Sequence, residues 1–456
     1  MTSQVEAPDP EFTKVFLTTF RCFTSAIELV QTLIARYEVT GVDGEYNTPA
    51  RVRVLNLIRQ WLDFHWEFDS DRPALKPLQT YAENAQVRIL PSSRQSLLES
   101  IKKASANVST ARSLLAPLDT SSLLEQTRKS TEMPSPNFSK SHQVLLSRYW
   151  VEKSTVVDFD AVEIARQLTL LNCRLLCQVP STELLTSALA KRENRPPRVS
   201  AISRMSTELT HFVTETVLAW QDTKKRSSMV KQWILICREL VNLQNYDTLM
   251  SIMCALQSAT VSRLKRTWSA VPRKTMAVFD EMSQIIDSSR NYAALRQKLS
   301  DASPPCLPFV GLYLTDLTFI DVGNPDSRTV TSRAGQPVKV INFDKWMRAA
   351  KTIDHYQRFQ VPYQLQAVKP MQDWLLGEFD RVRKLKSDDE SFYQRSLQLE
   401  PRNEVSTRNN SQESLVTPLL KAGIIDTADL KRPERLKPPS GLTRQRSHRF
   451  GFGVKS

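Results

Sequence analysis

Histidine, cysteine and clustered carboxylates are the side chains of this chain that could bind a metal ion or carry out catalysis. The five histidines have no spacing typical of a metal site: His65, His142, His211, His355 and His448. The six cysteines lie in apolar helical contexts without CxxC pairs or a nearby histidine, which favours reduced core residues of a cytosolic protein over metal ligands. Asp388, Asp389 and Glu390 stand at the expected start of a helix, where the helix dipole explains them better than acid catalysis.

Glycine is scarce, with 10 residues in the whole chain and none between Gly44 and Gly311. A loop that cradles phosphate needs glycine so that backbone N–H groups can approach the ligand. No Walker or dinucleotide-binding loop can therefore lie in that central region. No serine or cysteine sits in a nucleophile-elbow context either, so we expect function from a surface and not from a catalytic pocket.

The elements that would present such a surface are helices, since the central region is rich in Leu, Ala, Arg, Gln and Glu. We predict an all-α protein of two helical domains, the second with a projecting helical hairpin. The composition divides the chain into a first helical domain at 9–108, a Ser/Thr/Pro-rich linker at 109–145, a second helical domain at 146–402 and a basic, disordered tail at 403–456.

Apolar periodicity gives the helices of both domains. Residues 11–39 predict a helix, a break and a second helix that Ser25 and Glu28 begin as a capping box. Residues 51–68 predict one helix, with His65 as a core or boundary residue. In the second domain Asp160 and Ser181 are predicted to cap helices, and residues 372–399 predict one long closing helix.

The stretch from 303 to 326, SPPCLPFVGLYLTDLTFIDVGNPD, is apolar in its first half and mixes polar with apolar residues in its second. Two prolines open it and Gly-Asn-Pro closes it, which are strong signals for a break and a turn. The pattern predicts one arm of a hairpin that is anchored in a core and projects outward. Residues 327–340 are expected to form a polar loop at its tip, and residues 342–358 its return arm.

The net charge is +14, and residues 401–456 carry 11 Lys and Arg against 5 Asp and Glu. A solvated tail is the simplest interpretation, followed by contact with an anionic membrane surface or a partner. Nucleic acid is not expected, because basic residues elsewhere alternate with acidic ones. The longest apolar stretch, around Pro308, is shorter than the roughly 18 residues that span a bilayer.

Several ordered motifs together resemble guanine-nucleotide exchange factors for Ras-family GTPases. IARQLTLLNCRLL, PSTELL, NYDTLMSIMCALQSATVSRLKRTW, PPCLPFVGLYLTDLTFIDVGNPD and INFDKW resemble the RasGEF catalytic domain. EFTKVFLTTFRCFTSAIELVQTLIARYEV and RVRVLNLIRQWLDFHW resemble the N-terminal Ras-exchanger motif. The resemblance implies an all-helical domain whose hairpin enters the GTPase beside the nucleotide and magnesium site and promotes GDP release.

The resemblance also assigns site residues. On the inserted face of the hairpin it places Thr318, Asp321, Val322 and Asn324. For the surface that grips the second switch of the GTPase, it points to Arg204, Met250, Trp268, Tyr292, Phe309 and Arg348. For Phe309 and Trp268 a core position is an equal alternative.

Two positions depart from the pattern of similar domains. Family members commonly read EEGNPD, whereas this chain reads DVGNPD, so Val322 replaces an acid that would interact with the phosphate-binding loop of the partner. Either Asp321 substitutes, or exchange rests on steric opening alone and is slower; we favour the second. The N-terminal module also begins at Asp9, so we expect it to lack the first helix of similar modules and to pack incompletely against the base of the hairpin.

These features predict a guanine-nucleotide exchange factor without covalent chemistry, cytoplasmic and recruited to the inner face of membranes. No cofactor is expected, because GDP, GTP and magnesium belong to the partner GTPase. The alternative is a module of the same fold that binds or scaffolds a small GTPase without releasing nucleotide. Val322 keeps this alternative open, and which GTPase is bound cannot be read from the residues.

Overall fold

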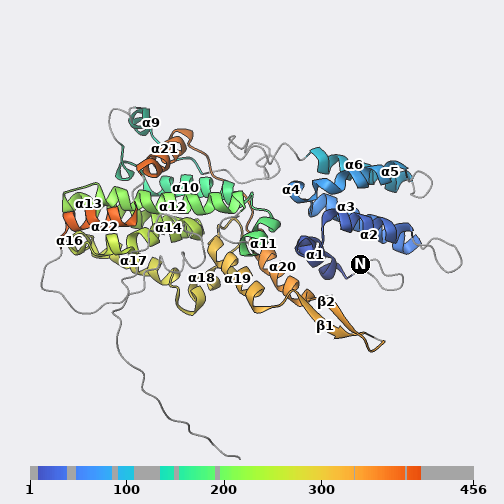
Figure 1. Ribbon diagram of the computed structural model, residues 1–456. Coiled ribbons are helices and arrows are strands. Elements are labelled where there is room, and N and C mark those ends of the chain that lie inside the picture. The colour runs from blue at the N-terminus through green and yellow to red at the C-terminus, as the bar shows by residue number, and fades with distance from the viewer. Residues whose placement is uncertain are drawn as a thin grey trace, which may run out of the picture.

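Figure 1 shows a computed structural model of the chain, which describes residues 9–38, 48–84, 91–106, 134–147, 154–189, 196–332, 334–385 and 388–401. Within these ranges the protein is helical apart from one two-stranded sheet, which confirms the all-α class. The basic tail at 403–456 and residues 109–133 of the predicted linker lie outside the described residues.

The N-terminal helices enclose a hydrophobic core of their own. They are α1 (Pro10–Thr19), α2 (Ala26–Glu38), α3 (Thr48–Phe64), α4 (Phe68–Asp71), α5 (Leu75–Asn84) and α6 (Pro91–Ala106). Trp61 is fully buried at the centre, with its ring edge-on to that of Phe20 at 5.5 Å, and its indole N–H donates to Asp71. The capping box is confirmed, because the backbone N–H of Ser25 donates to Glu28 and that of Glu28 to the Ser25 hydroxyl.

The second group of helices encloses a separate, larger core. It contains α9 (Lys140–Ser147), α10 (Ala161–Leu176), α11 (Ser181–Leu189), α12 (Pro197–Leu218), α13 (Thr223–Asn242), α14 (Tyr246–Gln257), α15 (Ala259–Ser262), α16 (Lys265–Ser269), α17 (Arg273–Ile285), α18 (Ser289–Asp301), α19 (Val310–Gly323), α20 (Phe343–Gln357), α21 (Lys369–Leu385) and α22 (Asp389–Leu399). Phe212 on α12 packs edge-on against Trp233 of α13 and Phe379 of α21. These aromatic contacts join the central helices to the last part of the described chain.

Several predicted elements differ from those observed. Residues 327–340 form an antiparallel pair, β1 (Ser327–Thr331) and β2 (Pro337–Ile341), in which Val330 lies opposite Val338. The helix predicted at 51–68 ends at Phe64, and the one predicted at 372–399 is divided into α21 and α22. The predicted linker contains the first part of α9.

Ser181 is wrong as a helix cap, because it is the first residue of α11. Its hydroxyl instead donates to Glu67 of the N-terminal group at 2.9 Å, and the N–H of Thr182 donates to the same carboxylate oxygen at 3.1 Å. A carboxylate at the start of a helix satisfies free N–H groups and opposes the positive end of the helix dipole. The cap of α11 therefore comes from the other helical group.

Candidate functional site

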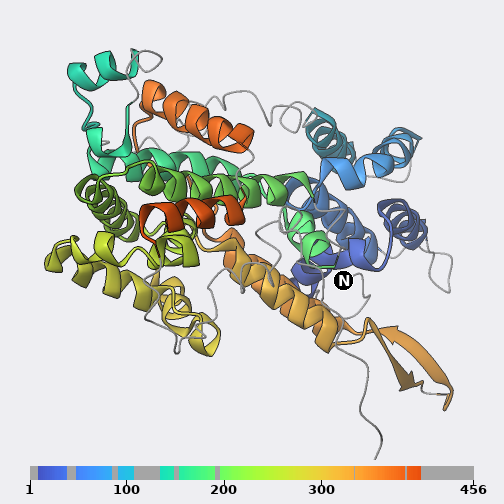
Figure 2. The ribbon, with the colours of Figure 1, turned by 60° about the vertical axis from the view of Figure 1, so that its left-hand side comes forward.

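Helices α19 and α20 lie side by side and lead into β1 and β2, which project from the helical body (Figure 2). This is the hairpin predicted from the sequence, with a β-hairpin in place of a loop beyond it. Gly335 has φ of +75° in the turn between the strands, a conformation that glycine adopts without strain. Asn324 and Pro325 follow α19, and proline cannot continue a helix, so the first arm ends there.

The base of the hairpin is fixed by backbone hydrogen bonds and one buried carboxylate. Leu307, just before α19, accepts from the N–H of Tyr246 at 2.9 Å. The backbone N–H of Val310, the first residue of α19, donates to the Asp247 carboxylate at 3.2 Å, and Asn172 donates to the same group at 3.0 Å. Burial raises the pKa of Asp247 to about 6. The first arm therefore starts from a rigid point on α14.

The outer half of α19 presents side chains to solvent. Leu317 is still buried, but Thr318 is exposed and Phe319 and Val322 are 67% and 80% exposed. The hydroxyl of Thr318 donates to the carbonyl of Leu314 at 2.8 Å, so it faces its own helix. An apolar surface kept exposed at the end of a projecting element is typical of a contact site for another molecule.

Lys345 on α20 holds the two arms together at this end. Its ammonium group is buried and forms ion pairs with Asp321 at the end of α19 and Asp326 before β1. The carboxylates raise the pKa of Lys345 against the opposing effect of its burial, which is the largest single influence. Asp321 is therefore engaged within the hairpin. Asn324 also turns inward, since its side-chain amide donates to the carbonyl of Ile320 at 2.8 Å.

Three predicted partner-binding residues lie near the base of the hairpin or within the core. Phe309 is buried and its ring centroid is 6.2 Å from that of Tyr292, which remains partly exposed. Burial raises the pKa of Tyr292 to about 12, so its hydroxyl stays protonated. Met250 is 1% exposed in α14. Its side chain contributes packing and no accessible surface, so we leave Met250 out of the contact surface proposed below.

The other three predicted partner-binding residues are Trp268, Arg204 and Arg348. Trp268 is partly exposed, packs on Phe279 and donates its indole N–H to the carbonyl of Val261 at 2.9 Å. Arg204 is exposed on α12 beside Glu208, which pairs with Arg383 of α21 at 3.2 Å. This places Arg204 near α21, and no described contact joins it to the hairpin residues.

Arg348 is exposed on the return arm α20. Among the described residues, no carboxylate forms an ion pair with its guanidinium group. Arginine is enriched at the energetic centres of protein interfaces, where its planar group can make several hydrogen bonds at once. We therefore keep Arg348 in the contact surface proposed below.

The N-terminal helices pack directly on the return arm. The rings of Phe12 on α1 and Phe343 on α20 are stacked with centroids 4.3 Å apart. Lys14 pairs with Asp354 of α20 at 2.7 Å, although both side chains are at least one-third exposed and this pair adds little stability. Helix α1 itself thus supplies a contact to the return arm, and whether the packing is complete stays a prediction.

Phe23 extends this interface, with its ring 5.9 Å from Trp346. Cys22 lies close enough to Lys345, Asp321 and Asp326 for their charges to affect its pKa, which burial raises to about 12. The module thus reaches the residues that join the two arms. The sequence signal for Lys345 was weak, since a lysine three residues into a helix is ordinarily solvated.

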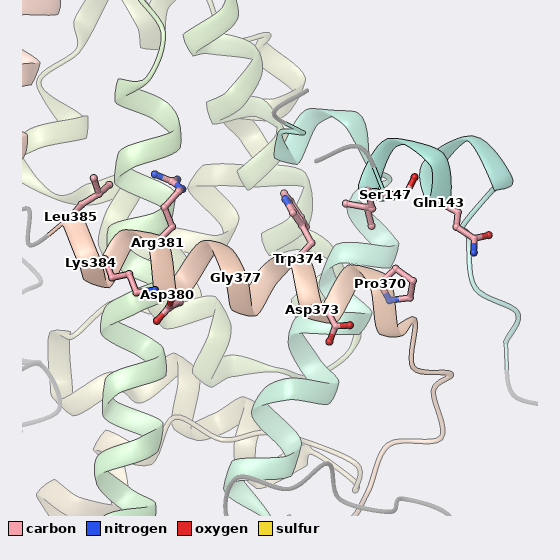
Figure 3. Close-up of a pocket in the computed structure, with 11 residues that line it drawn as sticks. Gln143, Ser147, Pro370, Asp373, Trp374, Gly377, Asp380, Arg381, Lys384 and Leu385 are labelled. Carbon is pink, nitrogen blue, oxygen red and sulfur yellow. Dashed lines mark ion pairs between the residues drawn. The ribbon is translucent and has the colours of Figure 1, made fainter. Parts of the chain in front are cut away.

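A groove of about 690 Å³ between α9 and α21 does not form a catalytic centre (Figure 3). Trp374 lines it, together with Asp380, which pairs with Lys384, and Arg381, which pairs with Glu378. Its charges are already neutralised by neighbours. In the described ranges, no three His, Cys, Asp or Glu side chains are grouped to hold a metal ion, and no helix is long and apolar enough to cross a membrane.

The sequence matches the RasGEF N-terminal motif over residues 1–81 and the RasGEF domain over residues 163–347. The chain contains both of these domains. The RasGEF match runs from α10 to the start of α20 and so contains the whole exposed arm α19 with Thr318 and Val322. The N-terminal motif contains α1 and Glu67, so the contacts of α1 with α20 and of Glu67 with α11 join the two modules.

Several known proteins are similar to most of this chain. Ras guanine nucleotide exchange factor I of Dictyostelium discoideum is 32% identical over 87% of the chain and 45% of its own length. Ras guanine nucleotide exchange factor A of the same organism is 30% identical over 86% of the chain and 62% of its length. Cell division control protein 25 of Candida albicans is 30% identical over 89% of the chain and 30% of its own length. The chain thus spans less than two thirds of the length of each of these relatives.

Proposed function

We propose that this protein promotes release of guanine nucleotide from a Ras-family GTPase. The observation that carries the proposal is the exposed outer half of α19, with Thr318, Phe319 and Val322, inside the stretch that matches the RasGEF domain. The hairpin enters the GTPase beside the site of the nucleotide and magnesium ion. Thr318 crowds the magnesium site and Val322 faces the loop that binds phosphate.

The exchange reaction follows from thermodynamic linkage. A GTPase that binds nucleotide with a picomolar Kd has a binding free energy of about 16 kcal/mol for that nucleotide. Contacts with the hairpin do not need to offset this whole amount. A protein that binds the nucleotide-free GTPase more tightly than the loaded one lowers nucleotide affinity by the same factor. The rigid base at Asp247 supports this role, because a fixed arm is not displaced when it meets the partner.

The opening of the nucleotide site is steric in this proposal. Asp321 is paired with Lys345, so its carboxylate is not free to replace the acid that Val322 lacks. Releasing Asp321 would leave the buried ammonium group of Lys345 with Asp326 as its remaining partner. We therefore expect slower exchange than an acid at position 322 would give.

The grip on the second switch of the GTPase is assigned to the accessible predicted residues, Arg204, Arg348, Tyr292 and Trp268. The buried ring of Phe309 packs against the ring of Tyr292. Nucleotide and magnesium come with the GTPase, and the protein itself carries neither. We place the reaction in the cytoplasm at the inner face of a membrane that holds the GTPase, with the basic tail as a contact to anionic lipid.

Release of a fluorescent GDP analogue from purified Ras and Rap proteins tests the proposal. The full chain should accelerate release in proportion to its concentration, and excess GTP should then load the GTPase. No acceleration on any member of a Ras-family panel would overturn the exchange function.

One observation favours a second function. Val322 presents an apolar side chain, 80% exposed, at a position where an acid would favour exchange. The hairpin would then dock a GTPase and leave its nucleotide bound. Binding of the loaded and the nucleotide-free GTPase should be measured side by side. Equal affinities, together with an unchanged release rate, would support docking alone.

A further inference from the structure

The last turn of α10 carries a pair of cysteines that the proposed function does not use. All six cysteines of the chain are free, and Cys177, which follows the last residue of α10, is partly exposed. Its Sγ atom is 3.6 Å from that of Cys173, which is buried one turn earlier. Two thiols in contact at the surface of a core can do chemistry that a single buried thiol cannot.

A disulfide between these two residues needs a local change at the end of α10. The Cβ atoms of residues four apart on a helix lie about 5–6 Å from each other, whereas those of a disulfide lie about 3.5–4.5 Å apart. The sulfur atoms must approach by about 1.5 Å more to form a bond of about 2.05 Å. Cys177 lies at the end of the helix, where the chain turns toward Val179 and can adjust more easily than within it.

We propose that Cys173 and Cys177 form an oxidation site that hydrogen peroxide closes to a disulfide within α10. The Cys173 thiolate attacks one oxygen of peroxide, which breaks the O–O bond and gives a sulfenic acid and hydroxide. The Cys177 sulfur then attacks the sulfenic sulfur, and the hydroxyl leaves as water with the proton of the thiol. Two thiols and one peroxide thus give one disulfide and two water molecules.

The surroundings support these roles. The thiols of Cys173 and Cys177 lie within hydrogen-bonding distance, and this contact lowers the pKa of Cys173, so the thiolate that reacts first is the one with a second thiol beside it. The partly exposed Cys177 opens a short route from solvent for a molecule as small as peroxide. Cys237 and Cys254 have no such route, because both are buried, and burial raises the pKa of Cys254 to about 12.

The site also lies beneath the return arm of the hairpin. The Cys173 sulfur is 3.9 Å from the carbonyl oxygen of Val361, just beyond α20. The carbonyl of Leu176, between the two cysteines, accepts from the Gln360 side chain at 2.9 Å and from the Tyr356 hydroxyl at 3.4 Å. Closing the disulfide moves the turn that carries this carbonyl. Oxidation therefore disturbs the packing of α20 against the end of α10.

Mass spectrometry of the full chain tests the site directly. Trypsin cleaves after Arg174, between the cysteines, so a disulfide would link the peptide at 167–174 to the one at 175–191. After peroxide treatment and alkylation without reductant, we expect this linked pair with two hydrogen atoms lost, and its disappearance on reduction. Cys177→Ser should abolish it, whereas Cys22→Ser, at another partly exposed cysteine, should leave it unchanged.

The result that would overturn the proposal is separate oxidation of Cys173 or Cys177 to sulfinic acid, or no oxidation, in a chain whose circular dichroism spectrum is native. A second measurement addresses the hairpin: hydrogen exchange at residues 343–357 should quicken at least several-fold after peroxide and recover after reduction. Unchanged exchange would remove the link to α20. Neither readout involves a GTPase, so the failure of this inference and that of nucleotide exchange are distinguishable.

Discussion

The ammonium group of Lys345 lies 2.5 Å from the carboxylate of Asp321 and is buried between the two arms of the hairpin. Its second carboxylate partner, Asp326, lies beyond the end of α19. A single side chain on α20 thus fixes both the end of the exposed helix and the entry to the strands. This relationship also keeps Asp321 away from any partner.

Replacing Lys345 tests whether its ion pairs with Asp321 and Asp326 support the hairpin. Lys345→Met keeps most of the buried length and removes the charge, and we expect a loss of about 2 kcal/mol of unfolding free energy, less than for a fully enclosed pair because Asp321 and Asp326 can be rehydrated. Nucleotide release should slow as the end of α19 loses its anchor. Urea unfolding and GDP release measure the two effects. Lys339→Met on the exposed strand β2 is the control, and an equal effect there would contradict the assignment.

An acid at position 322 tests the steric proposal. Val322→Glu places a carboxylate on an 80% exposed position, where it should approach the phosphate-binding loop of the GTPase and accelerate GDP release about tenfold, the effect of roughly 1.4 kcal/mol. Val330→Glu adds the same charge to an exposed position of β1 and serves as the control. If both variants release GDP at the rate of the unchanged protein, the missing acid does not limit exchange.

Charge reversal of Arg348 tests the grip on the GTPase. Arg348→Glu should raise the Kd for the nucleotide-free GTPase about tenfold or more, since a favourable contact becomes a repulsive one. Stability should change little, because the side chain is exposed. Lys231→Glu reverses an exposed charge on α13 and should leave binding unaltered. Binding can be followed by isothermal titration calorimetry.

The cap that joins the two modules can be removed by Glu67→Ala. We expect α11 to lose about 1 kcal/mol of local stability, as measured for other helix caps. Hydrogen exchange of the first amides of α11, which includes Thr182, should report this loss. Glu83→Ala removes an exposed carboxylate of the same module and is the matched control. Equal protection of α11 in both variants would mean that Glu67 does not cap it in solution.

The imidazole of His65 should make the free energy of unfolding depend on pH. Burial lowers its pKa to about 4 in the folded protein, whereas an unfolded histidine titrates near 6.5. Its folded pKa is depressed, so the unfolded state binds the proton more readily, and stability is lost as pH falls from about 6.5 to 4. The loss should be on the order of 2 kcal/mol. Unfolding by urea across this range should show a shallower slope for His65→Gln, and parallel slopes would contradict the assignment.

Much of the fold and the position of the site could be read from short-range signals. Two prolines before α19 and Gly-Asn-Pro after it mark where a helix must begin and end, and the capping box of Ser25 and Glu28 marks the start of α2. The strands β1 and β2 were missed because their alternation is weak and both faces are largely solvated. Met250 was named as a surface contact because a motif gives a residue's place in the chain and not its exposure.

The sequence by itself determined the helical class and the arm that presents Thr318 and Val322, because both follow from the spacing of apolar residues and from proline and glycine. Only the tertiary structure decided that Lys345 engages Asp321, that Glu67 caps α11, and that Cys173 lies against Val361, just beyond the return arm. These contacts depend on which helices become neighbours. That choice is made by the packing of whole apolar faces, so it is not encoded at any one of these positions.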